Sequence, residues 1–263
     1  MHRLVATDLD GTLLHSDGTV TARTRDVLAA LEDRGVTVVF VTGRPVRWMD
    51  ELWEHVGGHG LAICSNGGIV YDVHARAVAQ ARTVPREIGL EVGELLRAAV
   101  PDTSFALEKT DGFAKEPAFM PRVEPPPDLV IGPLEEIFDD SVVKILARHE
   151  DHDPEQFWTH VEEAVGHLVT TTWSSTGALV EMSASGVTKA STLELVCAER
   201  GITAEDVVAF GDMPNDLPLL GWAGTSYAMA NAHPSILELA DHVAPANDED
   251  GVARVLEELF DLR

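Results

Sequence analysis

Two aspartates near the amino terminus have the residue type and spacing of a reactive carboxylate pair. Asp8 and Asp10 follow residues 4–7 (Leu-Val-Ala-Thr), a largely apolar run that predicts a buried parallel strand. Side chains two positions apart on a strand point to the same face, so both carboxylates face one point. Such a pair repels unless a cation or a shared proton relieves it. The pattern favours a magnesium site in which one aspartate attacks and the other transfers protons. An ordinary strand that ends in a turn at Gly11 is the structural alternative.

A second strand-to-helix turn has groups that suit an anion. Residues 35–41 predict a strand that ends at Thr42 and Gly43, with a helix beginning at Pro45. A hydroxyl and free backbone N–H groups at such a turn can hold a phosphate group. Arg44 could either bind a substrate or cap the helix, and the sequence favours neither.

Three more charged residues stand at element ends in the second half of the chain. Lys189 lies near the start of a predicted helix over 187–200. A cation there opposes the helix dipole, which suggests an anionic ligand, with a solvated surface lysine as the alternative. Asp212 and Asp216 follow an apolar strand near 207. Asp216 fits a helix start, whereas Asp212 at the strand tip has no such structural reason.

These segments together resemble the haloacid dehalogenase superfamily of phosphohydrolases. Its four motifs occur in order, as Asp8-Leu9-Asp10-Gly11-Thr12, Val41-Thr42-Gly43-Arg44, Lys189 and Gly211-Asp212-Met213-Pro214-Asn215-Asp216. Their spacing is similar to that of the Cof-type subfamily, whose cap domain is inserted between the second and third motifs. Residues 64–68 (Cys-Ser-Asn-Gly-Gly) and 228–232 (Ala-Met-Ala-Asn-Ala) are similar to further Cof-type signatures. The resemblance covers the predicted core, and the cap agrees in size and position.

The resemblance implies Mg²⁺-dependent hydrolysis of a small phosphomonoester, such as a sugar phosphate or phosphorylated metabolite. Asp8 would form an aspartyl-phosphate, and Asp10 would act as general acid and base. Magnesium would be bound by Asp8, by the backbone carbonyl of Asp10 and by Asp212. Asp216 would orient the metal's water molecules or Lys189. The groups expected to hold the phosphoryl oxygens are Thr42, the Gly43 amide, Lys189 and Asn215.

Strands alternate with helical patterns along the chain, which is typical of a parallel α/β sheet. We expect an α/β fold with a Rossmann-like parallel sheet core, formed by residues 1–81 and 185–263, and an inserted α+β cap at 82–184. The elements predicted for the core are helices over 21–34, 187–200 and 249–260, a hairpin of strands at 61–64 and 68–71, and strands near 207 and 227. The elements predicted for the cap are helices over 85–99 and 154–165, strands over 141–146, 167–173 and 177–182, and an extended loop at 124–127.

Composition limits the possible partners. The 263 residues suit one large domain or two modest ones, and 45% of them are hydrophobic. A net charge of −25 argues against binding to nucleic acid or an anionic membrane, although a metal and a lysine can still attract a small anion within a cleft. Cys64 and Cys197 are the only cysteines, which predicts no disulfide framework and a reducing cytoplasm. The first predicted strand begins too early for a signal peptide to precede it. The oligomeric state is not predicted.

Three other functions remain open at this level. A phosphomutase would use the same motifs and return the phosphoryl group to its substrate. A two-component receiver domain also combines acidic residues, Thr and Lys, but Thr42 stands in the wrong order for it. A metabolite-binding protein with residual hydrolysis is the third.

Some conspicuous residues have simpler explanations. The histidines and aspartates of 149–153 are more typical of a solvated loop than of a metal site. Trp158 and Trp173 are expected in the cap core. Glu181 is most simply interpreted as a strand-edge carboxylate.

Overall fold

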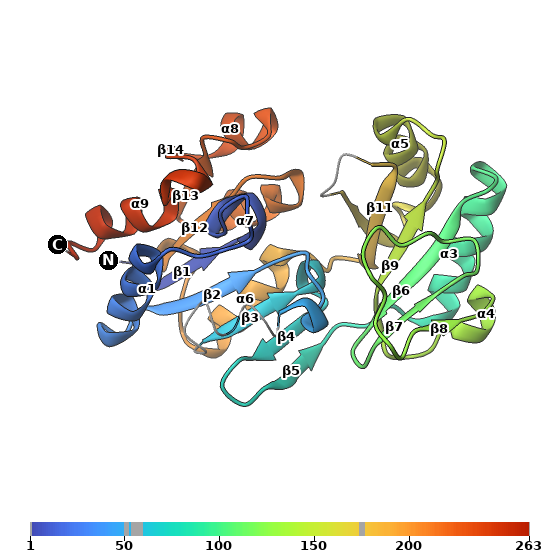
Figure 1. Cartoon of the computed structure of the whole chain (residues 1–263), viewed down its shortest axis with the longest axis horizontal. Helices are drawn as coiled ribbons and strands as arrows, with labels where there is room; N and C mark the ends of the chain where they lie inside the picture. Colours follow the sequence, from blue (N-terminus) through green and yellow to red (C-terminus); the bar gives the residue numbers. More distant parts are fainter. Residues whose placement is uncertain (1, 50–52, 54–59, 174–176, 263) are drawn as a thin grey trace. The chain divides into compact units, whose positions relative to one another are not determined.

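The computed structural model describes residues 2–49, 53, 60–173 and 177–262. The chain divides into two compact units, Met1–Ala79 with Thr188–Arg263, and Gln80–Val187 (Figure 1). These boundaries lie two or three residues from the predicted ones. The predicted α/β class is confirmed, because the first unit is built on a mainly parallel sheet with helices between its strands.

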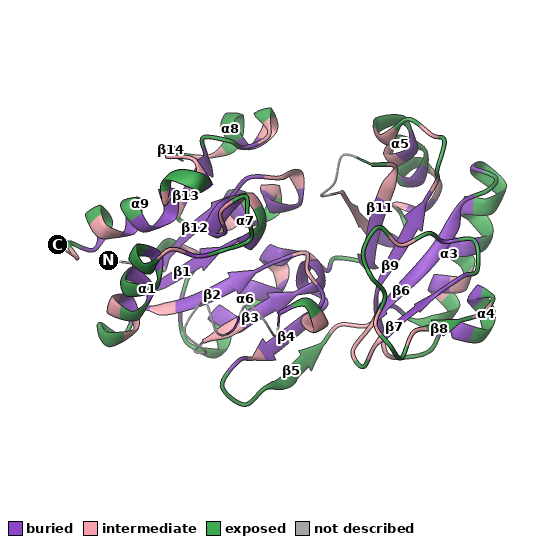
Figure 2. Cartoon of the chain, in the orientation of Figure 1, coloured by how far each residue is buried: buried purple, intermediate pink, exposed green. Residues whose placement is uncertain are grey.

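A sheet of eight strands forms the centre of the described part of the first unit. The strands are β1 (Leu4–Thr7), β2 (Thr37–Val41), β3 (Leu61–Cys64), β4 (Ile69–Asp72), β5 (Ala77–Ala81), β12 (Val207–Gly211), β13 (Thr225–Met229) and β14 (His242–Ala244). Their order is β14-β13-β12-β1-β2-β3-β4-β5, and the pairs from β14 to β3 are parallel. β3 and β4 form the predicted antiparallel hairpin. β1 and β12 are buried throughout, as expected of central parallel strands (Figure 2).

Helices alternate with most strands of this sheet along the chain, and the last of them follows the final strand. They are α1 (Ala22–Asp33), α6 (Lys189–Glu199), α7 (Leu217–Trp222), α8 (Pro234–Leu239) and α9 (Gly251–Leu259). α1 follows Thr21, whose hydroxyl accepts a hydrogen bond from the Thr24 N–H and so caps the helix. No helix in the described part of the chain is long and apolar enough to span a membrane.

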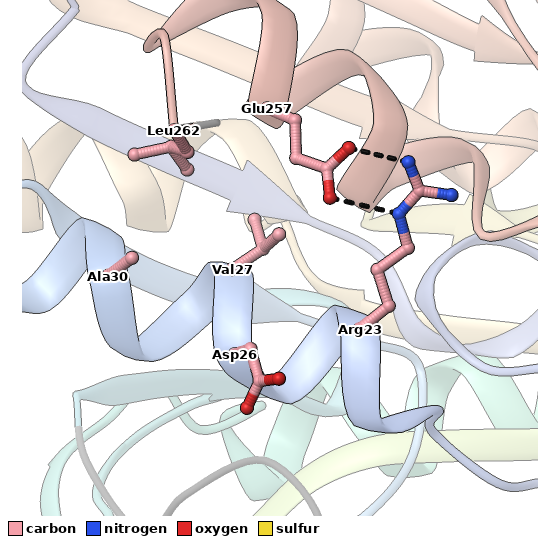
Figure 3. A pocket seen from close by; sticks show the side chains of 6 residues that line it. All are labelled: Arg23, Asp26, Val27, Ala30, Glu257 and Leu262. Carbon is pink, nitrogen blue, oxygen red and sulfur yellow. Dashed lines mark hydrogen bonds and ion pairs between the residues drawn. The ribbon is translucent and has the colours of Figure 1, made fainter.

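The contact between α1 and α9 includes a charged pair on the surface of the first unit. Arg23 donates two hydrogen bonds to the Glu257 carboxylate beside a pocket also lined by Val27 and Leu262 (Figure 3). None of the residues that line this pocket is among the predicted site residues.

The helix predicted to begin at Pro45 lies largely outside the described residues. The chain directly after Pro45 forms a short 3₁₀ turn, η2 (Val46–Trp48).

The second unit is a mainly antiparallel sheet with helices packed on it. Its strands are β6 (Ser104–Lys109), β7 (Phe113–Lys115), β8 (Val130–Ile131), β9 (Val142–Arg148), β10 (Val169–Thr172) and β11 (Leu179–Ala184), in the order β10-β11-β9-β6-β7-β8. Among the described strands of this sheet, only the β7–β8 pair is parallel. Its helices are α3 (Arg86–Ala99), α4 (Leu134–Ile137) and α5 (Pro154–Val165). α3 and α5 pack together and bury Leu96, Phe157 and Val161 against Phe105 and Met182 of the sheet. This apolar layer is the main core of the unit.

A buried ion pair lies among the strands of the second unit. Lys144 Nζ of β9 donates to Glu181 Oε1 of β11 over 2.6 Å, and the two side chains are 2% and 9% exposed. Glu181 pairs in register with Leu146, so it lies on the same sheet face as Lys144, two residues earlier on β9. Glu181 is therefore a buried partner of Lys144 rather than a strand-edge carboxylate.

We expect Glu181→Leu to lower the free energy of unfolding by about 3–5 kcal/mol, because it removes a carboxylate from a buried ammonium group. Lys144→Met/Glu181→Leu should lose less than this single variant, since it buries neither charge. Urea denaturation followed by circular dichroism measures both. The control is Glu150→Gln, whose ion pair with Arg122 is exposed and should contribute less than about 1 kcal/mol. A double variant no more stable than Glu181→Leu would contradict this account.

Candidate active site

The order of strands in the first unit determines where the predicted site residues meet. β1 lies between β2 and β12, so the chain runs outward in both directions from the centre of the sheet. The carboxyl ends of such neighbouring parallel strands form a crevice where ligands bind in open α/β sheets. Asp8 follows β1, Thr42 follows β2 and Asp212 follows β12. The topology therefore places these residues at one edge of the sheet.

Lys189 connects two of the predicted aspartates. Its Nζ donates to Asp8 Oδ1 over 2.8 Å and to Asp216 Oδ1 over 2.7 Å. The Lys189 and Asp216 side chains are 1% and 0% exposed, so this is a buried ion cluster. The other Asp216 oxygen accepts hydrogen bonds from the N–H groups of Asp212 and Met213. Asp216 thus lies against Lys189, one of the two partners considered for it, and holds the start of the loop after β12.

Ionisation of the cluster reflects an excess of carboxylates. Burial raises the pKa of Asp8 well above its ordinary value, with Lys189 opposing this and the Asp216 and Asp212 charges adding to it. Burial, together with Asp216, raises the pKa of Asp212 to about 7. Burial alone would lower the pKa of Lys189, but the Asp216 and Asp8 carboxylates outweigh it and raise that pKa. One ammonium group therefore does not neutralise three buried carboxylates.

The turn after β1 packs directly on Asp212. Thr12 Oγ1 donates to Asp212 Oδ1 over 2.9 Å. Gly11 has a φ of 72°, and a Cβ atom there would lie 2.3 Å from Asp212 Oδ2. Only glycine combines this left-handed backbone with so close an approach. The Asp-Gly-Thr sequence is thus the local reason that the turn after β1 can lie directly against the Asp212 side chain.

The predicted phosphate-binding groups form a second, mostly neutral set. Thr42 is fully buried, and its Oγ1 accepts a hydrogen bond from the Arg44 N–H, which leaves its hydroxyl hydrogen for donation. A Cβ atom on Gly43 would lie 3.6 Å from Asn215 Nδ2, so these two residues are neighbours. Asn215 Nδ2 itself donates to Asn66 Oδ1 over 3.1 Å.

The Asp10 side chain lies outside the ion cluster. Its two carboxylate oxygens accept hydrogen bonds from Arg44 Nε and Nη2, at 2.8 and 2.5 Å, and the side chain is 58% exposed. Arg44 thus has a partner that neither alternative considered for it included. Charge-assisted hydrogen bonding to Asp10 raises the pKa of Arg44 further.

Two asparagines that had no predicted role support the turn after β1. Asn231 Nδ2 donates to the Gly11 carbonyl over 2.8 Å, and Asn231 Oδ1 accepts from the Asn247 N–H over 3.0 Å. Asn247 Nδ2 in turn donates to the Leu14 carbonyl over 2.9 Å. The sequence marked Asn231 as part of a family signature, whereas Asn247 had no such signal.

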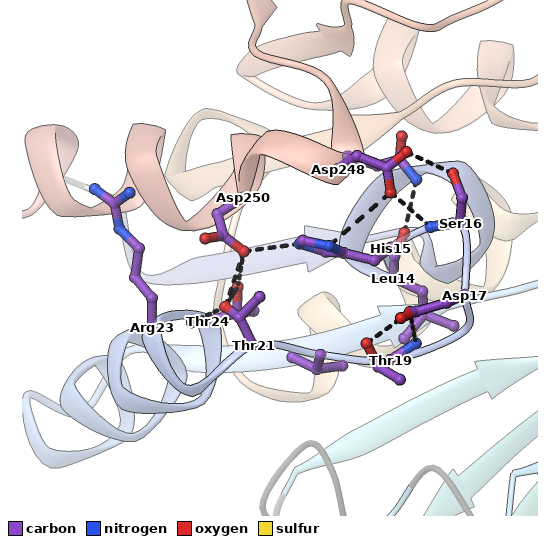
Figure 4. Close-up of polar contacts among 12 residues, drawn as sticks. Leu14, His15, Ser16, Asp17, Thr19, Thr21, Arg23, Thr24, Asp248 and Asp250 are labelled. Carbon is purple, nitrogen blue, oxygen red and sulfur yellow. Dashed lines mark hydrogen bonds and ion pairs between the residues drawn. The ribbon is translucent and has the colours of Figure 1, made fainter.

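The chain that follows this turn is attached to the loop before α9. His15 Nε2 lies 2.9 Å from Asp250 Oδ1, and Ser16 donates from both its N–H and its hydroxyl to Asp248 (Figure 4). Thr21 and Thr24 also contact Asp250. These contacts extend the support of the site by a layer of polar groups.

The residues present fit a hard divalent cation. The carboxylates of Asp8, Asp212 and Asp216 offer oxygen atoms that all lie within 4.8 Å of one another. Buried oxygen ligands with net negative charge suit Mg²⁺. Asn215 Oδ1 is also buried and has no hydrogen-bond partner in the described structure. Within the described residues, this is the one convergent set of three or more possible metal ligands.

The histidine-containing loop of the second unit does not form such a set. Asp153 caps α5 by accepting a hydrogen bond from the Gln156 N–H. His149 Nε2 lies 3.2 Å from the Pro101 carbonyl, and His149 Nδ1 accepts from the Asp151 N–H. These contacts agree with a capping loop.

Comparison with known proteins identifies the class of enzyme. Residues 5–256 match the sequence model of the haloacid dehalogenase-like hydrolase family. The chain is 30% identical, over 97% of its length and 94% of the relative's, to 5-amino-6-(5-phospho-D-ribitylamino)uracil phosphatase of Bacillus subtilis. It is 29% identical, with 97% of both chains covered, to pyridoxal phosphate phosphatase of Escherichia coli. A solved structure of a phosphatase of this superfamily from Bacteroides thetaiotaomicron has a similar fold, with a TM-score of 0.81 and 23% sequence identity. The superposition covers 99% of this chain and 96% of the Bacteroides protein.

The chain belongs to the haloacid dehalogenase-like hydrolases. The resemblance inferred from its four motifs is confirmed, as is the predicted enzyme class, a phosphatase of this family.

We expect Lys189→Met to lower the free energy of unfolding by about 3–5 kcal/mol in the presence of a chelator, because two buried carboxylates lose their cation. Lys189→Met/Asp216→Asn should recover part of this loss. Lys109→Met is the control, since its partner Asp139 is 55% exposed and the pair should contribute under about 1 kcal/mol. Denaturant titration of the wild-type protein and these three variants measures the free energies of unfolding. A double variant less stable than Lys189→Met would contradict the proposed balance of charge.

Proposed function

We propose that this protein hydrolyses a small phosphomonoester through an aspartyl-phosphate on Asp8. The observation that carries the proposal is the buried cluster in which Lys189 bonds both Asp8 and Asp216, next to Asp212 at the carboxyl edge of the sheet. Such a cluster holds a carboxylate nucleophile in one orientation and places a positive charge beside the attacked group.

In the first chemical step, an Asp8 carboxylate oxygen attacks phosphorus and the bond between phosphorus and the ester oxygen breaks. The leaving oxygen receives a proton from Asp10. In the second step, Asp10 takes a proton from a water molecule, which attacks the same phosphorus. The bond to Asp8 then breaks, and inorganic phosphate leaves with the Asp8 carboxylate restored.

Arg44 bears on the role proposed for Asp10. Both Asp10 oxygens accept hydrogen bonds from Arg44, so at least one must be released before Asp10 can meet the leaving oxygen. The exposure of Asp10 leaves room for such a rotation. We infer that Arg44 holds Asp10 near the nucleophile between turnovers.

Neutral and cationic donors would stabilise the phosphoryl group. Gly43, which follows Thr42, lies close to Asn215, and Lys189 is the buried cation that bonds Asp8 and Asp216. Donors fixed before the reaction stabilise charge that develops in the transition state at little reorganisation cost.

Magnesium is the cofactor that best fits the donor set. The Asp8 and Asp212 carboxylates and the Asp10 backbone carbonyl would hold it, with Asp216 fixing Lys189 beside them. When bound, Mg²⁺ would offset the negative charge of the carboxylates and of the phosphoryl oxygens.

The relatives suggest the substrate class without selecting one compound. Phosphatases for pyridoxal phosphate and for a phosphoribitylamino-uracil are about equally similar to this chain, at 29% and 30% identity. We infer a small phosphorylated metabolite, and a panel of such esters assayed for released phosphate should yield at least one substrate. Transfer to a second site of the substrate without release would instead favour a phosphomutase.

We expect Asp8→Asn to reduce phosphate release on the best ester to background, because it removes the nucleophile and nearly preserves shape. Asp10→Asn keeps the nucleophile but lacks the acid and base, so its rate should fall by about 10² to 10⁴. An activated ester such as p-nitrophenyl phosphate should partly restore the first step in Asp10→Asn, since its leaving group needs little protonation.

The phosphoenzyme provides the control for this assignment. Acid-quenched mass spectrometry of Asp10→Asn should find phosphate on the peptide that contains Asp8, with fragmentation placing it on that residue. Phosphate on any other residue, or full activity of Asp8→Asn, would overturn the mechanism.

We also expect millimolar Mg²⁺ to raise the melting temperature by several degrees over a chelator control. A ligand at a hundredfold excess over its dissociation constant adds about 2.7 kcal/mol, and about 1 kcal/mol shifts a domain of this size by roughly 2–4 °C. Asp212→Asn should abolish the rise. Sodium chloride at equal ionic strength controls for screening of the −25 net charge, and an equal Mg²⁺ effect in Asp212→Asn would count against the site.

A further inference from the structure

The turn between β3 and β4 has a backbone that its residues rarely adopt. In η3 (Ser65–Gly67), Ser65 and Asn66 have φ angles of 52° and 56°, and Gly67 has 106°. Asparagine tolerates the left-handed region better than most residues, but two consecutive non-glycine residues there are strained. Such strain persists where the surrounding structure fixes it, often beside a functional site.

The turn is fixed from two sides. The Asn66 N–H donates to the Thr42 carbonyl over 3.1 Å, and the Ser65 N–H donates to the Arg44 carbonyl over 2.9 Å. On the other side, the Gly67 carbonyl accepts from Thr192 Oγ1 over 2.8 Å. A Cβ atom on Gly67 would lie 2.3 Å from the carbonyl oxygen that precedes Lys189, so the turn packs tightly on the start of α6.

The Asn66 side chain reaches two of the predicted phosphate-binding residues. Its Oδ1 accepts from Asn215 Nδ2 over 3.1 Å, and it would lie 3.1 Å from a Cβ atom on Gly43. Asn66 and Asn215 are 2% and 6% exposed, so water does not readily replace this contact. Asn215 Oδ1 has no hydrogen-bond partner among the described residues, which is unusual for a buried amide and points to a ligand that donates a hydrogen bond to it, such as water.

We propose that Asn66 is a positioning residue: by accepting one Asn215 Nδ2 hydrogen it fixes the amide so that the second Nδ2 hydrogen can donate to a phosphoryl oxygen. The inference rests on the proposed function, in which Asn215 contacts the phosphoryl group. The terminal torsion of asparagine is broad, so an amide without a fixed partner samples several orientations. The left-handed backbone of Asn66 is what aims its Oδ1 at Asn215 and Gly43 together.

The test measures binding of inorganic phosphate by calorimetry, with Mg²⁺ present, beside kcat and KM on the best ester. Asn66→Gly removes the acceptor and still suits a φ of 56°. It should weaken phosphate binding about tenfold and raise KM, with little change in melting temperature. Asn215→Ala should weaken binding to a similar extent. Asn66→Gly/Asn215→Ala should be no weaker than Asn215→Ala, because residues that act through one another are not additive.

Two further variants separate the side chain from the backbone. Asn66→Ala should match Asn66→Gly in phosphate affinity but melt at a lower temperature, because alanine is strained at this φ. Arg76→Gly, at an exposed residue with a φ of 52°, should leave affinity unchanged.

The outcomes distinguish this inference from the proposed function. Two results would overturn only the positioning role, provided that the wild-type protein hydrolyses an ester. The first is that the losses of phosphate affinity add up in Asn66→Gly/Asn215→Ala. The second is that phosphate affinity among the variants follows their melting temperature rather than the presence of the Asn66 side chain. A wild-type protein that neither binds phosphate nor hydrolyses any ester would overturn both. Phosphate binding with non-additive losses but no hydrolysis would support Asn66 and overturn the catalytic proposal.

Discussion

The structure of the site depends on one buried ammonium group shared between carboxylates. Lys189 is almost fully buried and bonds Asp8 and Asp216, while Asp212 lies close enough for its charge to act on the same cluster. A buried charge is tolerated only when it is paired, so the positions of α6 and of the two strand ends are linked through this one side chain. The negative charge that remains is why the cluster fits a cation.

Sheet topology makes this meeting of distant residues possible. Thr12 and Asp212 are 200 positions apart in the chain, yet they bond each other because β1 and β12 are parallel neighbours that end at the same edge. A parallel sheet whose chain runs outward from its centre leaves a crevice where its connections diverge. The long segment Gln80–Val187 forms a compact unit of its own, so it can be inserted without changing the order of the core strands.

The sequence could predict the parts of the site that follow from strand ends. Asp8, Thr42 and Asp212 each follow an apolar run, and the rule that carboxyl ends share an edge brings them together. It could not predict the partner of Asp10, because the bidentate pair with Arg44 depends on how the turn after β1 directs a side chain. The fold likewise contains elements that depend on contacts between distant residues and that the sequence does not predict.

Missed strands illustrate this limit further. β6 (Ser104–Lys109) was not predicted because the charged Glu108 interrupts its apolar pattern, although the strand is almost wholly buried. β5 (Ala77–Ala81) is an exposed edge strand, so it has no apolar face to detect. Long-range ion pairs, of which Lys144–Glu181 is one, let charged residues enter a sheet, and the sequence alone does not show which charges will meet. The Asn66–Asn215 contact was not predicted for the same reason, since it spans 149 positions.

Side-chain amides are suited to supporting the site because they fix backbone turns without adding charge. Asn231 holds Gly11 and Asn66 holds Asn215, both beside a cluster that already has more carboxylates than it can neutralise. A carboxylate in either place would add to this negative charge. Neutral hydrogen bonds therefore position the groups around the site, while its charges remain available for a metal ion and a phosphate ester.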